Sequence, residues 1–268
     1  GVVTITGTGG GQEDDQGLLN NEGISVTGGS TIRSGTGPLT LVGERGPGSN
    51  SEDIAVESGD NTLGGNTQSG NITLRGDILY FTETQTINTA GAATIEPRSN
   101  VFTGSLTGTI SNITFTRVSA LTLGKAGNTS GVTIGSATTI AGPITIYSDD
   151  IAINAALEAT DDTISLIGAV GGNLNGTVDN TSAGSITADN LLVKNIHNTT
   201  LRSNQNVSVD TLAASGVGQL LLWNTKAVTI GSIEGIDGVT GTGNVIIDTA
   251  SGDIDLTQPV STTGSGNP

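Results

Sequence analysis

The side chains best able to do chemistry in this sequence are carboxylates that occur as adjacent pairs. The pairs are Asp14 and Asp15, Asp149 and Asp150, and Asp161 and Asp162. Two carboxyl groups on one face can act as acid and base in glycoside hydrolysis. Adjacent residues of a strand point to opposite faces, however, and turn-forming residues surround each pair. We therefore expect solvated turn acids, and the sequence predicts no catalytic residue.

Nitrogen and sulfur chemistry is equally sparse. His197 is the single histidine, and its position after an apolar segment is typical of a surface turn. The chain has no cysteine, which excludes disulfides, thiolate metal sites and a thiol nucleophile. The nine basic residues are scattered between Arg33 and Lys226, without the cluster that lyase chemistry requires. The sequence therefore predicts no metal-binding residue, no cofactor and no cofactor-binding residue.

The charge of the chain restricts its partners. The net charge of −16 argues against nucleic acid, whose phosphates require lysine and arginine, and against anionic lipid. No apolar run approaches the ~18 residues of a membrane span, so we expect no membrane insertion of this segment. The apolar 34% of the chain consists mainly of Ile, Val, Leu and Ala, which excludes simple disorder and favours strands.

A short phrase recurs along the chain, and it defines the elements that would have to position any site. The stretch "VTIGSATTIAGPITIYSDDIAIN" (132–154) contains four versions of it, each with a small or polar residue between two apolar or β-branched ones. Two series recur at roughly 20-residue intervals. One begins at Leu121, Ile144, Ile164, Ile186, Val207 and Val228, and the other at Ile54, Ile72, Thr94, Ile113, Val132 and Ile151.

Alternation with period two predicts strands of three to five residues, separated by Gly, Asn, Asp and Ser turns. Such short strands cannot bury an apolar face alone, whereas stacked coils can. The sequence therefore predicts an all-β fold, a right-handed parallel β-helix of about 13 coils of roughly 20 residues. The competing antiparallel sandwich would need more aromatic residues and hairpin turns at shorter spacing.

We expect a single β-helix segment over residues 1–268, excerpted or processed from something longer. Irregular, loop-bearing coils are expected at 1–71, regular coils at 72–260 and a linker-like tail at 261–268. The stretches Gly9–Gly23 and Val42–Asn71 are expected to be projecting loops, and a site is to be sought in these irregular loops before Asn71.

Two features invite a ligand and have plainer interpretations. Tyr80, Phe81 and Phe102 lie within one segment, where core filling is favoured over a sugar-stacking patch. An ice-binding surface would require unbroken outward columns of threonine. The expected outward column is interrupted, since it contains Thr40, Ala55, Thr73, Thr114, Thr133 and Ala152.

The stretches Leu121–Thr160 and Gly241–Val260 resemble the β-strand repeats of giant bacterial surface adhesins of the filamentous-haemagglutinin type. The resemblance extends over roughly Asp53 to Pro268. It implies secretion, an extracellular or cell-surface location and a β-helical rod that holds adhesive regions away from the cell. Expected partners are host or environmental glycans or surface receptors, neighbouring domains of the same long chain, and a second copy through end-to-end self-association.

The function expected on this basis is a structural or adhesive stalk or passenger segment without catalysis. One alternative is a carbohydrate-active β-helix enzyme or carbohydrate-binding module, which convergent carboxylates in a groove would favour. Another is the subunit of an extracellular β-solenoid filament, because the ends of a solenoid expose strand edges.

Overall fold

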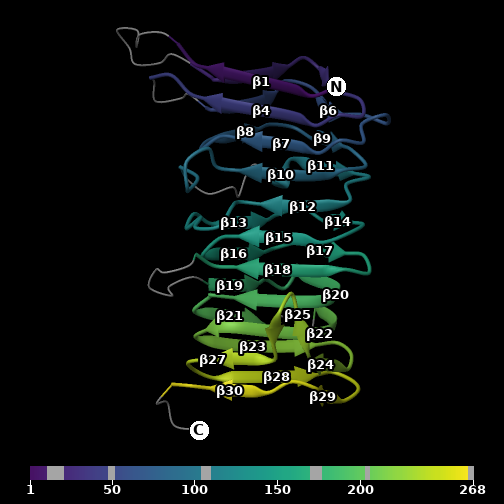
Figure 1. The fold of residues 1–268 in the computed structure, drawn as a ribbon, viewed down its shortest axis with the longest axis vertical. Coiled ribbons are helices and arrows are strands. Elements are labelled where there is room, and N and C mark those ends of the chain that lie inside the picture. The colour runs from purple at the N-terminus through teal and green to yellow at the C-terminus, as the bar shows by residue number, and fades with distance from the viewer. Residues whose placement is uncertain (11–20, 48–51, 104–109, 170–176, 203–205, 265–268) are drawn as a thin grey trace. The chain divides into compact units, whose positions relative to one another are not determined.

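The computed structural model describes residues 1–10, 21–47, 52–103, 110–169, 177–202 and 206–264. It divides into two compact units, Gly1–Lys125 and Ala126–Pro268. Each unit consists of short parallel strands stacked coil upon coil (Figure 1), which confirms an all-β, parallel β-solenoid-like architecture. Among the residues described, no helix has the length and apolar character needed to span a membrane.

The first unit has three strands in each of its best-formed coils, and each strand belongs to a different sheet. The first sheet contains β1 (Val3–Thr8), β4 (Leu39–Glu44), β7 (Ile72–Arg75), β10 (Ala92–Glu96) and β12 (Ala120–Leu123). The second contains β2 (Ile24–Thr27), β5 (Ile54–Glu57) and β8 (Leu79–Phe81). The third contains β3 (Thr31–Ile32), β6 (Thr62–Gly64), β9 (Gln85–Asn88) and β11 (Ile113–Thr116).

Aliphatic side chains in register form the core of this unit. Leu39, Ile72 and Ala93 occupy matching positions of β4, β7 and β10, and each is at most 1% exposed. Full burial of one such Leu or Ile stabilises the fold by about 1.5–3 kcal/mol. The core thus results from repetition, since each coil buries its apolar residues against the coils beside it.

Threonine occupies the outward position between the buried residues. The expectation of an interrupted column is wrong for this first unit, whereas in the second unit Thr133 pairs with Ala152, as expected. In the first sheet the column is unbroken through Thr4, Thr40, Thr73, Thr94 and Thr122. In the third it runs through Thr31, Thr62, Thr86 and Thr114. The expected column had combined residues of different sheets, such as Ala55 of β5. Threonines opposite one another stabilise neighbouring strands.

Buried polar side chains secure the corners between sheets. Asn61 is 1% exposed, and its side chain accepts a hydrogen bond from the N–H of Ser30 at 2.7 Å. Gln68 is fully buried and donates to the carbonyl oxygens of Gly37 and Gly70. Asp53 is 3% exposed, and its carboxylate accepts backbone N–H groups, including that of Arg45 at 2.7 Å. These contacts satisfy corner groups that burial would otherwise leave unpaired.

The second unit repeats this arrangement in three parallel rows. The first row contains β13 (Val132–Ile134), β16 (Asp150–Ile153), β19 (Thr177–Asn180), β21 (Asn198–Leu201), β23 (Gln219–Asn224) and β28 (Val245–Thr249). The second contains β14 (Thr138–Ile140), β17 (Ala156–Ala159) and the first halves of β20 (Ser185–Lys194) and β22 (Val207–Val217).

The third row contains β15 (Ile144–Tyr147), β18 (Thr163–Ile167), the second halves of β20 and β22, then β24 (Val228–Ile230), β27 (Val239–Gly241), β29 (Ile254–Leu256) and β30 (Val260–Thr262). A small antiparallel hairpin interrupts this row between β24 and β27. It consists of β25 (Ser232–Ile233) and β26 (Ile236–Asp237).

The hairpin covers an apolar strip on the outside of the coils. Leu192 and Ala213 are outward residues in register on β20 and β22, yet they are 2% and 0% exposed. Ile233 of the hairpin packs against both, and Ile236 lies at the edge of the same cluster. The turn residues Glu234 and Gly235 both have positive φ, as a tight two-residue hairpin turn requires.

Coil length differs from the regular expectation of roughly 20 residues. Val132 pairs with Ile151, and Ile144 with Ile164, as the repeat predicts. The partners Val3 and Leu39 are about 36 residues apart, however, and Ile164 pairs with Leu191, about 27 residues on. The predicted number of about 13 coils is therefore not confirmed.

Two local expectations also change. The stretch Val42–Asn71 contains β5 and β6, so it is not a projecting loop, although its residues 48–51 lie outside the described part. Most of the expected loop at Gly9–Gly23 also lies outside it. In the expected tail, Ser261 and Thr262 belong to β30, which pairs with β27, and residues 265–268 are not described.

Candidate functional site

Three of the acids singled out from the sequence accept hydrogen bonds from backbone N–H groups. Asp149 accepts the N–H of Ala169 at 2.7 Å, and Asp150 accepts the N–H and hydroxyl of Thr177. Asp162 accepts the N–H of Thr163 at 2.7 Å. Asp14 and Asp15 lie outside the described residues. Across the described ranges, no group of three or more His, Asp or Glu residues is placed to hold a metal ion.

The aromatic segment divides between core and surface. Phe81 is 2% exposed and Phe102 is 3% exposed, so both fill the core of the first unit. Tyr80 points outward from β8 and is 46% exposed. Core filling, the favoured interpretation, therefore holds for two of these three residues.

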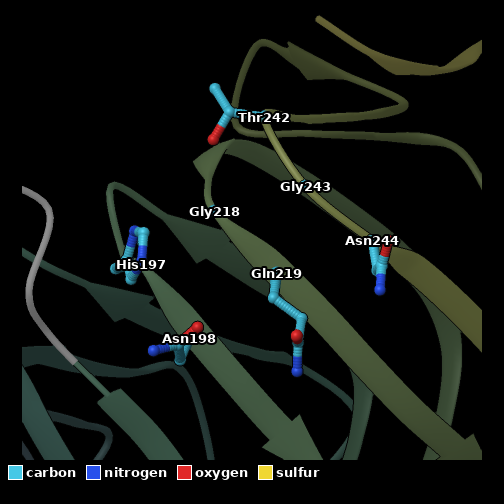
Figure 2. A pocket seen from close by; sticks show the side chains of 7 residues that line it. All are labelled: His197, Asn198, Gly218, Gln219, Thr242, Gly243 and Asn244. Atoms are coloured by element: carbon cyan, nitrogen blue, oxygen red, sulfur yellow. The ribbon is translucent and has the colours of Figure 1, made fainter. Parts of the chain in front are cut away.

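A hollow in the second unit is the candidate site. It is open to solvent, has a volume of about 290 Å³ and is lined by His197, Asn198, Gly218, Gln219, Thr242, Gly243 and Asn244. These residues stand at the corner that precedes β21, β23 and β28, one short segment from each of three successive coils (Figure 2). The sequence predicts His197 as a surface turn residue and does not connect it with the other lining residues.

Two glycines create the hollow. The register of β21, β23 and β28 places His197, Gly218 and Gly243 at matching positions of the three coils. A Cβ atom on Gly218 would lie 2.6 Å from Nδ1 of His197, and one on Gly243 would lie 2.5 Å from the carbonyl oxygen of Gly218. Neither position can accept a side chain without displacement of its neighbours. The imidazole therefore stands beside a column that carries only backbone.

Three amide side chains form the floor of the site. Asn198 pairs in register with Gln219, and Asn244 takes the same place on the next coil. Figure 2 shows Asn198 and Gln219 on neighbouring strands, with Asn244 beside them. Backbone hydrogen bonds fix their spacing. The N–H of Gln219 donates to the carbonyl oxygen of His197 at 2.6 Å, and the N–H of Leu220 donates to the carbonyl oxygen of Asn244 at 2.9 Å.

The chemistry of the hollow is that of polar recognition. Each amide offers two donor hydrogens and an acceptor oxygen, and imidazole can donate or accept. No carboxylate or nucleophilic thiol is among the lining residues, and Thr242 supplies the one hydroxyl. The arrangement can thus bind neutral groups that both donate and accept hydrogen bonds, such as hydroxyls.

A signal for this site exists in the sequence but requires the register to interpret it. The dipeptides His197-Asn198, Gly218-Gln219 and Gly243-Asn244 each stand at the beginning of a strand, the third immediately before it. They are separated by about 21 and 25 residues, because the third coil is longer. Without a known register, three such dipeptides are indistinguishable from ordinary turns.

Comparison of the chain with protein-family models, curated proteins and solved structures finds no match.

Proposed function

We propose that this chain is a structural and adhesive segment, a stalk or passenger region of a large secreted bacterial cell-surface protein, and that it performs no catalysis. We further propose that its coils are right-handed, as parallel crossovers prefer. The support for an extracellular bacterial location is the resemblance of its repeats to those of surface adhesins. The support for a structural role is the way in which the coils hold one another.

The stacking in register is the observation that carries the proposal. In the second unit Val178, Leu220 and other inward residues are at most 1% exposed, and their partners lie on adjacent coils. Buried corner side chains such as Asn128 and Asn224 donate to backbone carbonyls. Interactions between neighbouring coils can be repeated indefinitely, so a long rod can be built from many weak strands.

Adhesion also needs exposed groups, which the hollow at His197 supplies. Enzyme action, the principal alternative, draws no support from these acids, because the adjacent pair Asp149 and Asp150 and the separate Asp162 accept backbone N–H groups. A role as a neutral binding surface fits the lining better than acid–base chemistry does.

Bead adhesion and polysaccharide cleavage distinguish the two roles. Beads coated with the chain are expected to adhere to surfaces bearing host or environmental glycans, while the soluble chain releases no reducing ends from a polysaccharide panel. Release of reducing ends at a rate above that of a heat-denatured sample would contradict the proposal. Absence of adhesion to every surface in the panel would contradict its adhesive part.

A second candidate, the filament subunit, is favoured by one observation. Ile254, Leu256 and Val260 on the last described strands are 39%, 66% and 41% exposed, although their register partners on the preceding coil are buried. A further β-coil, supplied by the same chain or by a second copy, would cover them. Asp253 and Asp255 flank them and would oppose contact with another acidic end. Sedimentation velocity tests this candidate, since filament growth should appear at micromolar concentration and disappear in Leu256→Asp.

A further inference from the structure

The hollow at His197 continues into a wider surface along the outside of β21, β23 and β28. We name the outward side chains of these three strands, together with Arg202 just after β21 and Asn244 just before β28, the β21–β23–β28 face. Period-two alternation, counted with Arg202 and Asn244, gives each coil three outward positions, and the register aligns them into three columns. Successive coils are ~4.8 Å apart, so neighbouring members of a column are separated by that interval.

The first column is the amide column, which consists of Asn198, Gln219 and Asn244. Asn198 and Asn244 are exposed and Gln219 is half-buried. The second column is largely apolar, which is unusual for the outside of a coil. It contains Thr200, Leu221 and Ile246, of which Leu221 is half-buried and Ile246 is 40% exposed.

The third column contains the single tryptophan of the chain. Trp223 pairs with Asp248 on one side. On the other side, Arg202 is the residue after Leu201, which pairs with the residue before Trp223, so Arg202 takes the position opposite Trp223. The guanidinium of Arg202 reaches Asp248 at 2.6 Å, so the ion pair spans the coil that carries Trp223. Nε1 of Trp223 is buried without a hydrogen-bond partner among the described residues. The indole is thereby held against the surface.

Amides beside aliphatic and aromatic groups match the two kinds of surface on a sugar ring. The C–H faces of a pyranose pack on indole and aliphatic side chains, and its hydroxyls both donate and accept hydrogen bonds. The columns run along the stacking direction, and the amide column presents an amide once in each of the three coils. A linear chain of sugars would meet these amides in turn and reach the apolar groups of neighbouring coils, whereas a single sugar would use one coil.

Charge selects among such polymers. The chain carries −16, and the outward residues Asp150 and Asp179 lie on preceding strands of the same row. The one cation of the face, Arg202, is already paired with Asp248. Uronates and sulfated glycans would be repelled, because no unpaired cation of the face is available to them. The apolar column, one residue wide, is narrower than the core of a protein–protein interface.

We propose that the β21–β23–β28 face binds a linear neutral polysaccharide laid along the coils, with the amide column on its hydroxyls and Leu221, Ile246 and Trp223 beneath its rings. This inference rests on the proposed adhesive function and names its ligand class. It concerns binding alone and includes no bond-making step.

Trp223 is the intrinsic reporter for the test, since no other tryptophan contributes fluorescence. Hexasaccharides of glucose, mannose and xylose are titrated into the intact chain while Trp223 emission and heat of binding are followed. At least one neutral hexasaccharide is expected to shift the emission and to bind more tightly than oligogalacturonate. Double substitution Gln219→Ala and Asn244→Ala should weaken that binding tenfold or more. Asn154→Ala, on the same row but outside the face, should leave it unchanged.

Several outcomes would overturn the inference. They are no emission change and no heat with any hexasaccharide at millimolar concentration, binding that the double substitution leaves intact, and a preference for oligogalacturonate. Calorimetry on Trp223→Phe separates loss of the reporter from loss of binding, and circular dichroism establishes that each variant is folded. Bead adhesion that persists in the double variant would refute this face while leaving the adhesive function standing.

Discussion

The side-chain oxygen of Gln85 accepts a hydrogen bond of 2.9 Å from the backbone N–H of Asn61, one coil away. Asn61 in turn accepts the N–H of Ser30 from the coil before it. Both amide side chains are 1% exposed, so water does not satisfy these backbone groups. The corner of the first unit is therefore held by a short stack of amides that links three coils.

Removal of one member of this stack should destabilise the first unit. Gln85→Ala would leave the N–H of Asn61 buried and unpaired, at a cost of about 1–3 kcal/mol. Faster hydrogen exchange of β6 and β9 amides, measured by mass spectrometry, is the expected result. Asn100→Ala, an exposed amide of the same unit, serves as the control. Equal exchange in the two variants would show that the stack adds no stability.

One core position of the second unit should improve on substitution. Thr199 is fully buried between Val178 and Leu220, and its hydroxyl has no hydrogen-bond partner in the described part of the chain. Thr199→Val keeps the shape and removes the buried hydroxyl, so unfolding should cost about 1 kcal/mol more. Urea unfolding followed by Trp223 fluorescence measures this in the same unit. Thr200→Val, outward on the same strand, should have little effect, and a lower midpoint for Thr199→Val would contradict the prediction.

The pH dependence of the first unit should show a contribution from Glu52. Burial raises the pKa of Glu52, and the nearby carboxylates of Glu22 and Glu57 raise it further. Because the folded-state pKa lies above the unfolded value, ionised Glu52 destabilises the folded state at neutral pH. That penalty is lost as the pH falls through the folded pKa and is absent below the unfolded value of about 4.3.

Glu52→Gln should therefore raise the unfolding midpoint at pH 7, and its advantage over the parent chain should shrink as the pH falls toward 4. Thermal unfolding by circular dichroism at several pH values measures the difference. Asp60→Asn, an exposed acid of the same unit, is the matched control. An advantage for Glu52→Gln that stays constant with pH would refute the electrostatic explanation.

The hairpin of β25 and β26 should open without unfolding the coils. Ile233→Ala removes much of the contact with Leu192 and Ala213, which should weaken the hairpin by about 2 kcal/mol or more. The N–H of Gly238 donates to the carbonyl oxygen of Gly231 at 2.8 Å, and its hydrogen exchange should become faster. Hydrogen exchange in β18 should be unchanged. Glu234→Gln, which can keep the contact with Ser165, is the control. Global unfolding in Ile233→Ala would show that the hairpin belongs to the core.

The sequence predicts strand type, parallel stacking and the pairing of Val132 with Ile151 because period-two alternation and coil spacing are local properties. The sequence does not predict to which sheet each repeated motif belongs. Ile54 and Ile72 were assigned to one series, yet they lie on β5 and β7 in different sheets. The corner segments vary in length, so the number of residues in one coil varies too. Two motifs about 20 residues apart can therefore lie on different sheets.

The candidate site was missed for the same reason. His197, Gly218 and Gly243 come together only through the register of three coils, and each alone has the appearance of a turn residue. The hairpin was missed because its two-residue strands are too short for any periodicity to be recognised. Long-range register, which depends on packing, is what the local pattern does not contain.

Each repeated motif pairs with the equivalent motif one coil away, and this pairing is what makes the repeats structural. Cysteine cross-linking measures it directly. The chain has no cysteine, so introduced pairs are unambiguous. Thr133 and Ala152 are outward partners in register on β13 and β16, at a strand spacing that a disulfide can bridge. The pair Thr133→Cys and Ala152→Cys should therefore form an intramolecular disulfide in the folded chain. The pair Thr133→Cys and Thr145→Cys, closer in sequence but on different rows, should not, and cross-linking of the second pair in preference to the first would contradict the coil register described above.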